Sequence, residues 1–147
     1  MKILAGLMVF CALIFPHGVS AQTSCVPTPL SPNEAKVLLK NIPEALSAKH
    51  IGGKLSVIDW SPGSSYRTES FYLYELLSTK STETTPLDNG VLGYFGVNKR
   101  TGQVVELNSD KPSVEGAELK RLQVRFRKEH CIGADLVAKE ANLTLEK

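Results

Sequence analysis

The chain has 147 residues, of which 42% are hydrophobic and 22% are charged, and its formal net charge is +2 at pH 7. This length and balance predict one globular domain and exclude a chain that is disordered throughout. A net charge this close to zero gives no reason to expect a nucleic-acid partner.

The first 21 residues have the form of a secretory signal peptide. Lys2 precedes the continuous apolar run Ile3–Phe15, and the small residues Val19, Ser20 and Ala21 follow. An uncleaved transmembrane helix is the alternative, but a helix needs about 20 apolar residues to span a bilayer. We therefore expect cleavage near Ala21, no stable membrane anchor afterwards, and a secreted or periplasmic protein.

Cleavage also changes the cysteine content, because Cys11 is removed and only Cys25 and Cys131 remain. Two cysteines in an oxidising compartment predict one disulfide, with two free thiols as the alternative. The bond would connect residues 22–30, a proline-containing segment that predicts an extended arm, to the end of the last strong helix.

A helix is predicted to begin after the arm, because Ser31, Pro32 and Glu34 form a capping box with proline at the first helical position. Pro43 predicts a kink or a break. The buried stripe is predicted from apolar residues at helical spacing, namely Val37, Leu38, Ile42 and Leu46.

The middle of the chain predicts strands. Residues 54–60 alternate between polar and apolar, residues 61–65 form a turn, and residues 67–79 carry apolar side chains on both faces, which is typical of a central strand. Residues 90–107 predict a hairpin. Its turn, Asn98 to Gly102, fits a type I turn with a glycine bulge, because Gly102 can adopt a positive φ.

A second helix is predicted from a cap at Ser113 to about Glu129, with Leu119, Leu122 and Phe126 as its buried face. Its basic residues, Arg121 and Arg125 among them, form either a solvated helix face or a binding patch. Residues 134–147 predict a short helix or a frayed tail. The elements together predict a single α+β domain over residues 31–133, an antiparallel sheet of about four strands packed on helices, in the order α-β-β-β-β-α.

No catalytic constellation, metal site or cofactor site is predicted. The two histidines left after cleavage, His50 and His130, are isolated in the sequence, and no spacing typical of zinc ligands occurs. Four residues on the expected strands carry carboxylates that could pair for acid–base chemistry, namely Asp59, Glu69, Glu75 and Glu106. Carboxylates on exposed strand faces more often serve to keep the protein soluble.

Aromatic residues gather on or beside the expected sheet, and they either pack in the core or line a binding surface. The candidates for binding are Trp60, Tyr66, Tyr72, Tyr74 and Tyr94, with Arg121 and Arg125 on the helix. These residues predict a protein or peptide partner, and no oligomeric state follows from them.

Residues 31–107, one helix followed by strands and ending in G-Y-F-G-V-N-K-R-T-G-Q-V-V-E-L, resemble the PepSY domain of secreted bacterial proteins, whose last hairpin has a similar Tyr-x-Val and Thr-Gly-x-Val pattern. The resemblance implies a noncatalytic role in peptidase inhibition or peptide binding, and it covers about half of the chain. The hairpin together with L-K-R-L-Q-V-R-F-R is also similar to uncharacterised secreted bacterial proteins.

Residues 62–66, P-G-S-S-Y, resemble the Ser-Gly-x-x-Tyr loop of periplasmic lysozyme inhibitors, with proline in place of the first serine. Those proteins are all-β barrels, whereas two helices are expected here, so the segment is interpreted as a turn.

The sequence as a whole predicts a noncatalytic secreted or periplasmic binding protein, as a peptide-binding or peptidase-inhibitory module. The alternative is a small-molecule-binding protein or small enzyme with a pocket between sheet and helix. That alternative requires polar groups such as Asp59, Glu75 and Tyr94 to converge inside one cavity.

Overall fold

The structure, a computed structural model, describes residues 25–60, 69–80, 90–107, 109–110 and 113–141. The predicted signal peptide, Tyr66 and the turn at residues 61–65 lie outside these ranges. The described elements are, in chain order, α1 (Pro32–Leu39), α2 (Pro43–His50), β1 (Leu55–Asp59), β2 (Phe71–Ser78), β3 (Val91–Asn98), β4 (Val104–Glu106), α3 (Ala117–Glu129) and α4 (Ala134–Glu140).

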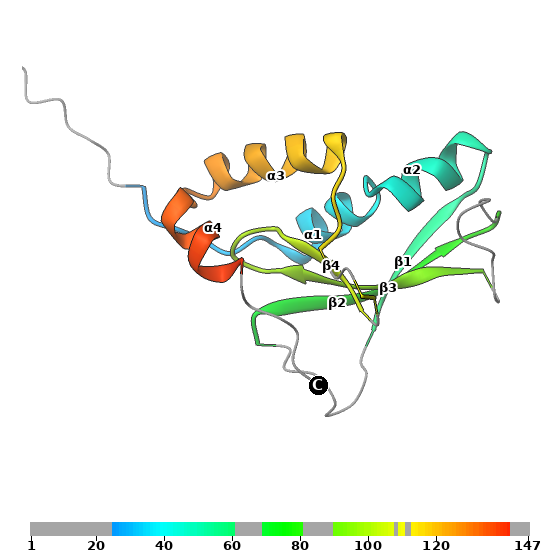
Figure 1. Cartoon of the computed structure of the whole chain (residues 1–147), viewed down its shortest axis with the longest axis horizontal. Helices are drawn as coiled ribbons and strands as arrows, with labels where there is room; N and C mark the ends of the chain where they lie inside the picture. The colour runs from blue at the N-terminus through cyan, green and yellow to red at the C-terminus, as the bar shows by residue number, and fades with distance from the viewer. Residues whose placement is uncertain (1–24, 61–68, 81–89, 108, 111–112, 142–147) are drawn as a thin grey trace, which may run out of the picture.

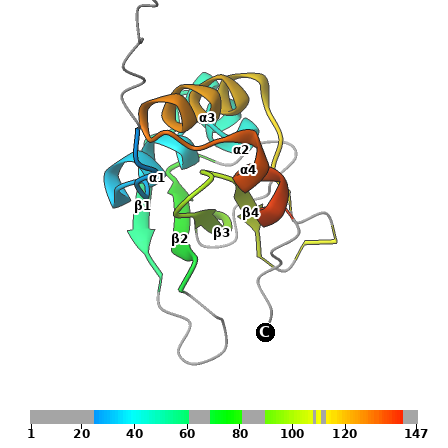
Figure 2. The same ribbon diagram turned by 90° about the vertical axis from the view of Figure 1, so that its left-hand side faces the viewer.

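The strands form one antiparallel sheet in the order β1-β2-β3-β4, which confirms the predicted α+β class and the central position of β2. In Figure 1 and Figure 2 the helices α1, α2 and α3 lie over the same face of this sheet, and α4 lies at the β3–β4 turn, where Arg100 forms an ion pair with Glu140. The segment at Ser113 pairs with Val105, so the outer side of β4 is partly covered.

The main core lies between the sheet and these helices. Alternation along β2 sends Tyr74 and Leu76 toward the helices, and Phe95 and Val97 of β3 lie on the same face. Each of these four side chains is buried to 1% exposure or less. Leu38 of α1 and the α3 residues Leu119, Leu122 and Phe126 complete the core, and the three α3 residues were predicted to be buried.

The first helical segment is divided in two, as the proline at position 43 predicted. The predicted buried stripe is wrong at two positions, because Val37 is 40% exposed and Leu46 is 36% exposed. Because the break separates α1 from α2, the two helices are oriented independently and each buries a different face. A single apolar stripe predicted for one continuous helix therefore does not describe them. Ala45 and Ala48 are the buried residues of α2.

Two helices end in the same hydrogen-bonded motif with different residues at its critical position. Gly52 follows α2 at φ +80°, and the amide of Gly53 donates to the carbonyl of Ala48. Cys131 follows α3 at φ +58°, and the amide of Ile132 donates to the carbonyl of Arg127. Glycine is the usual residue at this left-handed position, so a cysteine there is held at a cost in backbone energy.

The turn between β3 and β4 confirms the predicted role of Gly102, whose φ is +69°. The buried side chain of Asn98 organises the turn, because its Oδ1 accepts hydrogen bonds from the amides of Arg100 and Thr101, both at 2.9 Å. Asn98 therefore stabilises the turn from inside while Gly102 supplies the backbone conformation.

The start of α3 differs from the prediction. Ser113 does not cap this helix, which begins at Ala117 after an extended Gly116. Ser113 pairs instead with Val105, and the amide of Val114 donates to the carbonyl of Val104. The strand-like pairing of residues 113–114 with β4 thus delays the helix by about one turn.

Candidate functional site

The predicted binding tyrosines are divided between the two faces of the sheet. Tyr72 and Tyr74 face the helices, where their hydroxyls donate to the carbonyls of Leu30 (3.0 Å) and Pro32 (3.2 Å). Tyr74 is only 1% exposed, and its burial, with a smaller contribution from Asp59, raises its pKa to about 12. These two tyrosines fasten the start of α1 to β2, and Tyr74 belongs to the core.

Trp60 and Tyr94 lie together on the opposite face of the sheet, with ring centroids 4.8 Å apart. They border a second apolar cluster formed by Phe71, Leu73, Val105 and Leu107. Both rings are partly exposed. Of the four candidate aromatics that the structure describes, these two are the pair that it brings together outside the main core.

The two candidate arginines of α3 are engaged with carboxylates of their own helix. Arg121 donates to both oxygens of Glu118, at 2.9 and 2.6 Å, and Arg125 lies 3.7 Å from Glu129. Exposed pairs of this kind contribute little to stability and neutralise much of the local charge. These contacts favour the interpretation of this surface as a solvated helix face.

A groove of about 600 Å³ lies next to α3, away from both arginines. It is bounded by α3, by Val137 and Ala141 at α4, by residues 113–116 and by Gln103. None of the described aromatic or carboxylate candidates lines it. The basic residues in its lining are Lys120 and Arg127.

The candidate carboxylates do not meet in this groove or at a common point. Asp59 lies on the helix-facing side, 3.1 Å from the Nζ of Lys36. Glu75 pairs across the strands with Tyr94 on the other side. Among the described residues, no group of three or more His, Cys, Asp or Glu side chains is arranged to hold a metal ion.

β1 is an edge strand with one row of backbone groups directed away from the sheet. The amide of Trp60 donates to Leu73, and the amide of Thr79 donates to Lys54, so the backbone groups of residues 54, 56, 58 and 60 face β2. In an antiparallel ladder the alternate residues point the other way. The amides and carbonyls of Leu55, Val57 and Asp59 therefore face outward, beside an Ile58 side chain that is 47% exposed.

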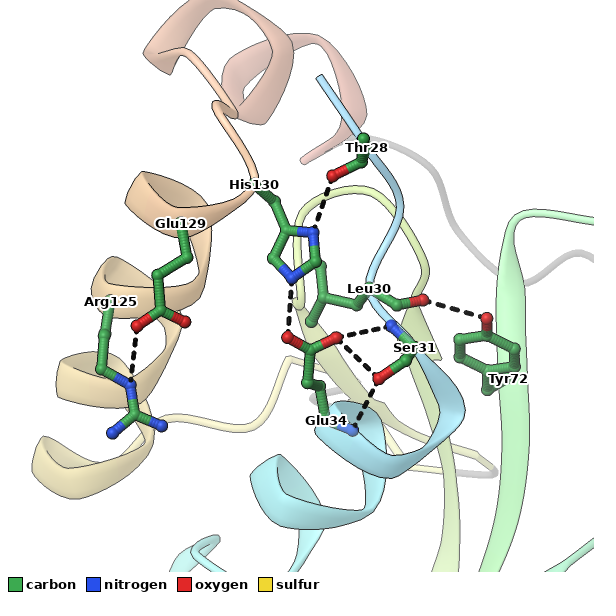
Figure 3. A network of polar contacts seen from close by, with 8 residues as sticks. All are labelled: Thr28, Leu30, Ser31, Glu34, Tyr72, Arg125, Glu129 and His130. Carbon is green, nitrogen blue, oxygen red and sulfur yellow. Dashed lines mark hydrogen bonds and ion pairs between the residues drawn. The ribbon is translucent and has the colours of Figure 1, made fainter. Parts of the chain in front are cut away.

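A polar network, shown in Figure 3, holds the N-terminal arm, residues 25–30, against the start of α1 and the end of α3. The Nε2 of His130 donates to Glu34 at 2.7 Å, and its Nδ1 lies 2.9 Å from the hydroxyl of Thr28. Glu34 also accepts from the amide and hydroxyl of Ser31, both at 2.7 Å, and so completes the predicted capping box. His130 is thus not isolated, and the prediction from sequence missed this contact.

The disulfide lies beside this network. Cys25 and Cys131 are paired with their Cα atoms 5.8 Å apart, and the amide of Thr28 donates to the carbonyl of His130. The arm continues to Leu30, which is buried and whose amide donates to the carbonyl of Lys99 in the β3–β4 turn. The arm is therefore a structural strap across the end of α3 and the hairpin.

The order hydroxyl, imidazole and carboxylate in Thr28, His130 and Glu34 is also found in nucleophilic active sites. Here the carboxylate is already used to cap α1, and none of the three residues lines the groove. A substrate-binding cavity beside the hydroxyl is a requirement of such chemistry. We therefore assign the network a structural role.

This role predicts a pH dependence. Burial alone would raise the pKa of Glu34, but the hydrogen bonds from His130 and Ser31 outweigh it and lower the pKa below 4.5. A lowered folded-state pKa stabilises the fold at pH values above the unfolded pKa, and this stabilisation is lost as the pH falls through the folded value. We expect Glu34→Gln to reduce the free energy of unfolding by roughly 1 kcal/mol at pH 7 and by less at pH 3.

Denaturant unfolding at both pH values measures this difference. Glu129→Gln, which removes an exposed ion pair with Arg125 outside the network, is the matched control and should change the free energy of unfolding by less than about 0.5 kcal/mol at both pH values. A Glu34→Gln variant whose unfolding free energy follows that of the wild type in parallel from pH 7 to pH 3 would contradict the role given to the network.

Comparison with known proteins shows a shared fold. No protein-family model and no curated protein matches the chain. A chain in the solved structure of a type VI secretion system effector-immunity complex from Pseudomonas protegens is similar, with a TM-score of 0.50 and 20% identity over 77% of this chain and 87% of that chain. At this identity the likeness establishes an α+β architecture common to most of both chains. Within the described residues, no helix has the length and hydropathy needed to cross a membrane.

Proposed function

We propose that this protein is exported and acts as a noncatalytic binding protein whose partner is another protein or a peptide. The observation that carries the proposal is the outward-facing backbone of β1. An edge strand with free amides and carbonyls can accept an extended segment of another chain by strand addition.

The two edges of the sheet differ in how they are protected. The outer side of β4 is partly covered by Ser113 and Val114. β1 has no such cover among the described residues, and its central outward-facing residue is Val57. A strand added there would extend the sheet and lie beside Ile58, which is 47% exposed. Backbone hydrogen bonds would supply affinity, and alternate side chains would supply specificity.

The resemblance to PepSY domains and the fold neighbour support the same class of function. The resemblance suggests peptide binding or peptidase inhibition. The neighbour comes from an effector-immunity complex, in which proteins bind one another, so a protein is the first kind of partner to test. The predicted signal peptide and the Cys25–Cys131 pair support a secreted or periplasmic location for this encounter.

The experiment compares Val57→Pro with Val57→Ala. Because the amide of Val57 points away from β2, proline removes an outward donor and leaves the β1–β2 ladder intact. Alanine shortens the same side chain but keeps the amide. Partners are first recovered with the wild-type exported protein from the periplasmic or secreted fraction, and the affinity of each variant for the purified partner is then measured by calorimetry.

We expect Val57→Pro to weaken binding by about tenfold, since a lost hydrogen bond contributes about 1 kcal/mol and added steric hindrance increases the effect. Val57→Ala should bind within about threefold of the wild type. Wild-type affinity in both variants would place binding elsewhere, and equal loss in both would assign the effect to the side chain of Val57 and contradict strand addition. Recovery of no protein, together with a bound metabolite or a hydrolysis that is lost on replacing Asp59 or Glu75, would favour the small-molecule alternative.

A further inference from the structure

The groove beside α3 has basic side chains that are not neutralised by carboxylates of the same helix. Lys120 and Arg127 both line it, whereas Arg121 and Arg125, outside it, are paired with Glu118 and Glu129. Among the described residues of the lining, Glu115 supplies the one carboxylate. The described lining residues therefore have an excess of one positive charge.

The polar groups of the groove are held in place by the hairpin turn. The Nε of Arg127 donates to the carbonyl of Thr101 at 2.8 Å, and the Nε2 of Gln123 donates to the carbonyl of Gly102 at 2.9 Å. The structure records no hydrogen bond from the terminal nitrogens of Arg127 to any described residue, so these donors remain for a ligand. Fixing the side chains in advance reduces the entropy lost when a ligand binds.

The three polar residues of α3 form a row. Lys120, Gln123 and Arg127 are separated by three and four positions, which places them on one helix face. At 1.5 Å per residue the row extends about 10 Å along the helix, which is the length of about three residues of extended chain. Arg127 is half-buried, and burial lowers its pKa, but a guanidinium remains charged at neutral pH.

Apolar side chains form the remainder of the groove. Val114, Leu119 and Val137 are part of the lining, with alanines 117 and 141. A simple anion would leave this apolar surface in water. An extended segment with carboxylates on one side and apolar side chains on the other would pair with the row and also cover the apolar lining.

We propose that the groove between α3, α4 and residues 113–116 is a docking site for an acidic, partly apolar segment of a protein partner. The inference rests on the proposed function, because it assumes that the partner is a protein. It adds a second contact surface at the β4 end of the sheet, on the far side from the β1 edge (Figure 2). The two surfaces can be tested separately.

The test uses a short synthetic peptide of alternating glutamate and leucine, which in extended form places its carboxylates on one side. Its binding to the wild-type exported protein is followed by NMR, through the side-chain N–H signals of Gln123 and Arg127. We expect these signals to shift, and we expect Lys120→Glu to weaken binding by about tenfold. The matched control is Lys128→Glu, which makes the same change of charge on α3 outside the groove lining and should change the affinity by less than about twofold.

Three results would overturn the inference. Equal weakening by Lys120→Glu and Lys128→Glu would show that net charge alone attracts the peptide. A peptide of alternating lysine and leucine that binds as tightly would show that charge does not select the ligand. Inorganic phosphate that binds as tightly as the glutamate–leucine peptide would identify a site for simple anions.

The same variants separate this inference from the proposed function. If a purified protein partner loses affinity with Val57→Pro but binds Lys120→Glu as the wild type does, the groove is not part of that interface and the proposed function stands. If the glutamate–leucine peptide binds in the groove but no protein partner is recovered, the groove is a site for acidic peptides, and strand addition of a protein partner at the β1 edge is contradicted.

Discussion

Replacing Cys25 and Cys131 together by serine is expected to lower the free energy of unfolding by about 4 to 5 kcal/mol. The bond joins residues 106 positions apart, and in the chain-entropy model a loop of that size greatly restricts the unfolded chain. The melting temperature should fall by more than about 10 °C. Denaturant unfolding of the oxidised wild type and the double variant measures the difference.

The conformation of Cys131 provides a sharper control. Because this residue lies at φ +58°, where glycine is favoured, Cys25→Ser combined with Cys131→Gly should be about 1 kcal/mol more stable than the double serine variant. If the double serine variant unfolds at the same denaturant concentration as the oxidised wild type, the disulfide does not stabilise the fold as described here. Two thiols that can be alkylated in the exported protein without reductant would show that the bond is absent.

Phe95→Ala is expected to lower the free energy of unfolding by about 3 to 5 kcal/mol, the range seen when a large buried aromatic is truncated in a core. Phe95 is 0% exposed and lies in β3 opposite Tyr74, where the sheet packs on the helices. Its removal leaves a cavity that neighbouring strands cannot close without breaking the sheet register.

Phe95→Leu is the matched control, because it keeps most of the apolar volume and should lower the free energy of unfolding by about 1 kcal/mol. Both variants are compared with the wild type by thermal and denaturant unfolding. Similar small losses in the two variants would mean that position 95 is not at the centre of the core.

The sequence predicted the features that depend on local pattern. Apolar side chains on both faces predicted that β2 is a central strand, and the positive φ of Gly102 followed from the turn residues that precede it. The spacing of Leu119, Leu122 and Phe126 predicted the buried face of α3. In each case the residues that determine the structure are within a few positions of one another.

Features that depend on distant contacts were missed or wrong. His130 looked isolated because its partner Glu34 is 96 positions away. The hydroxyl of Ser113 could cap a helix, but the backbone of Ser113 pairs with Val105 of β4 instead. Val37 and Leu46 are exposed because Pro43 allows α1 and α2 to orient independently.

The candidate site was predicted only in part, for the same reason. The sequence predicted tyrosines on the sheet but not which face each one occupies. Tyr74 faces the helices and is buried, whereas Tyr94 faces the other way and lies beside Trp60. The groove unites Gln103, Lys120 and Val137 from separate parts of the chain. The helical spacing of Lys120, Gln123 and Arg127 was the one local signal that could have indicated this surface.

The central claim is that β1 receives an extended segment of a protein partner, and amide hydrogen exchange tests it most directly. With a purified partner bound, we expect the outward amides of Leu55, Val57 and Asp59 to become protected. The amides of Ser56 and Ile58, which already face β2, should change little. Exchange at Leu55, Val57 and Asp59 that is unchanged by the bound partner would contradict the claim.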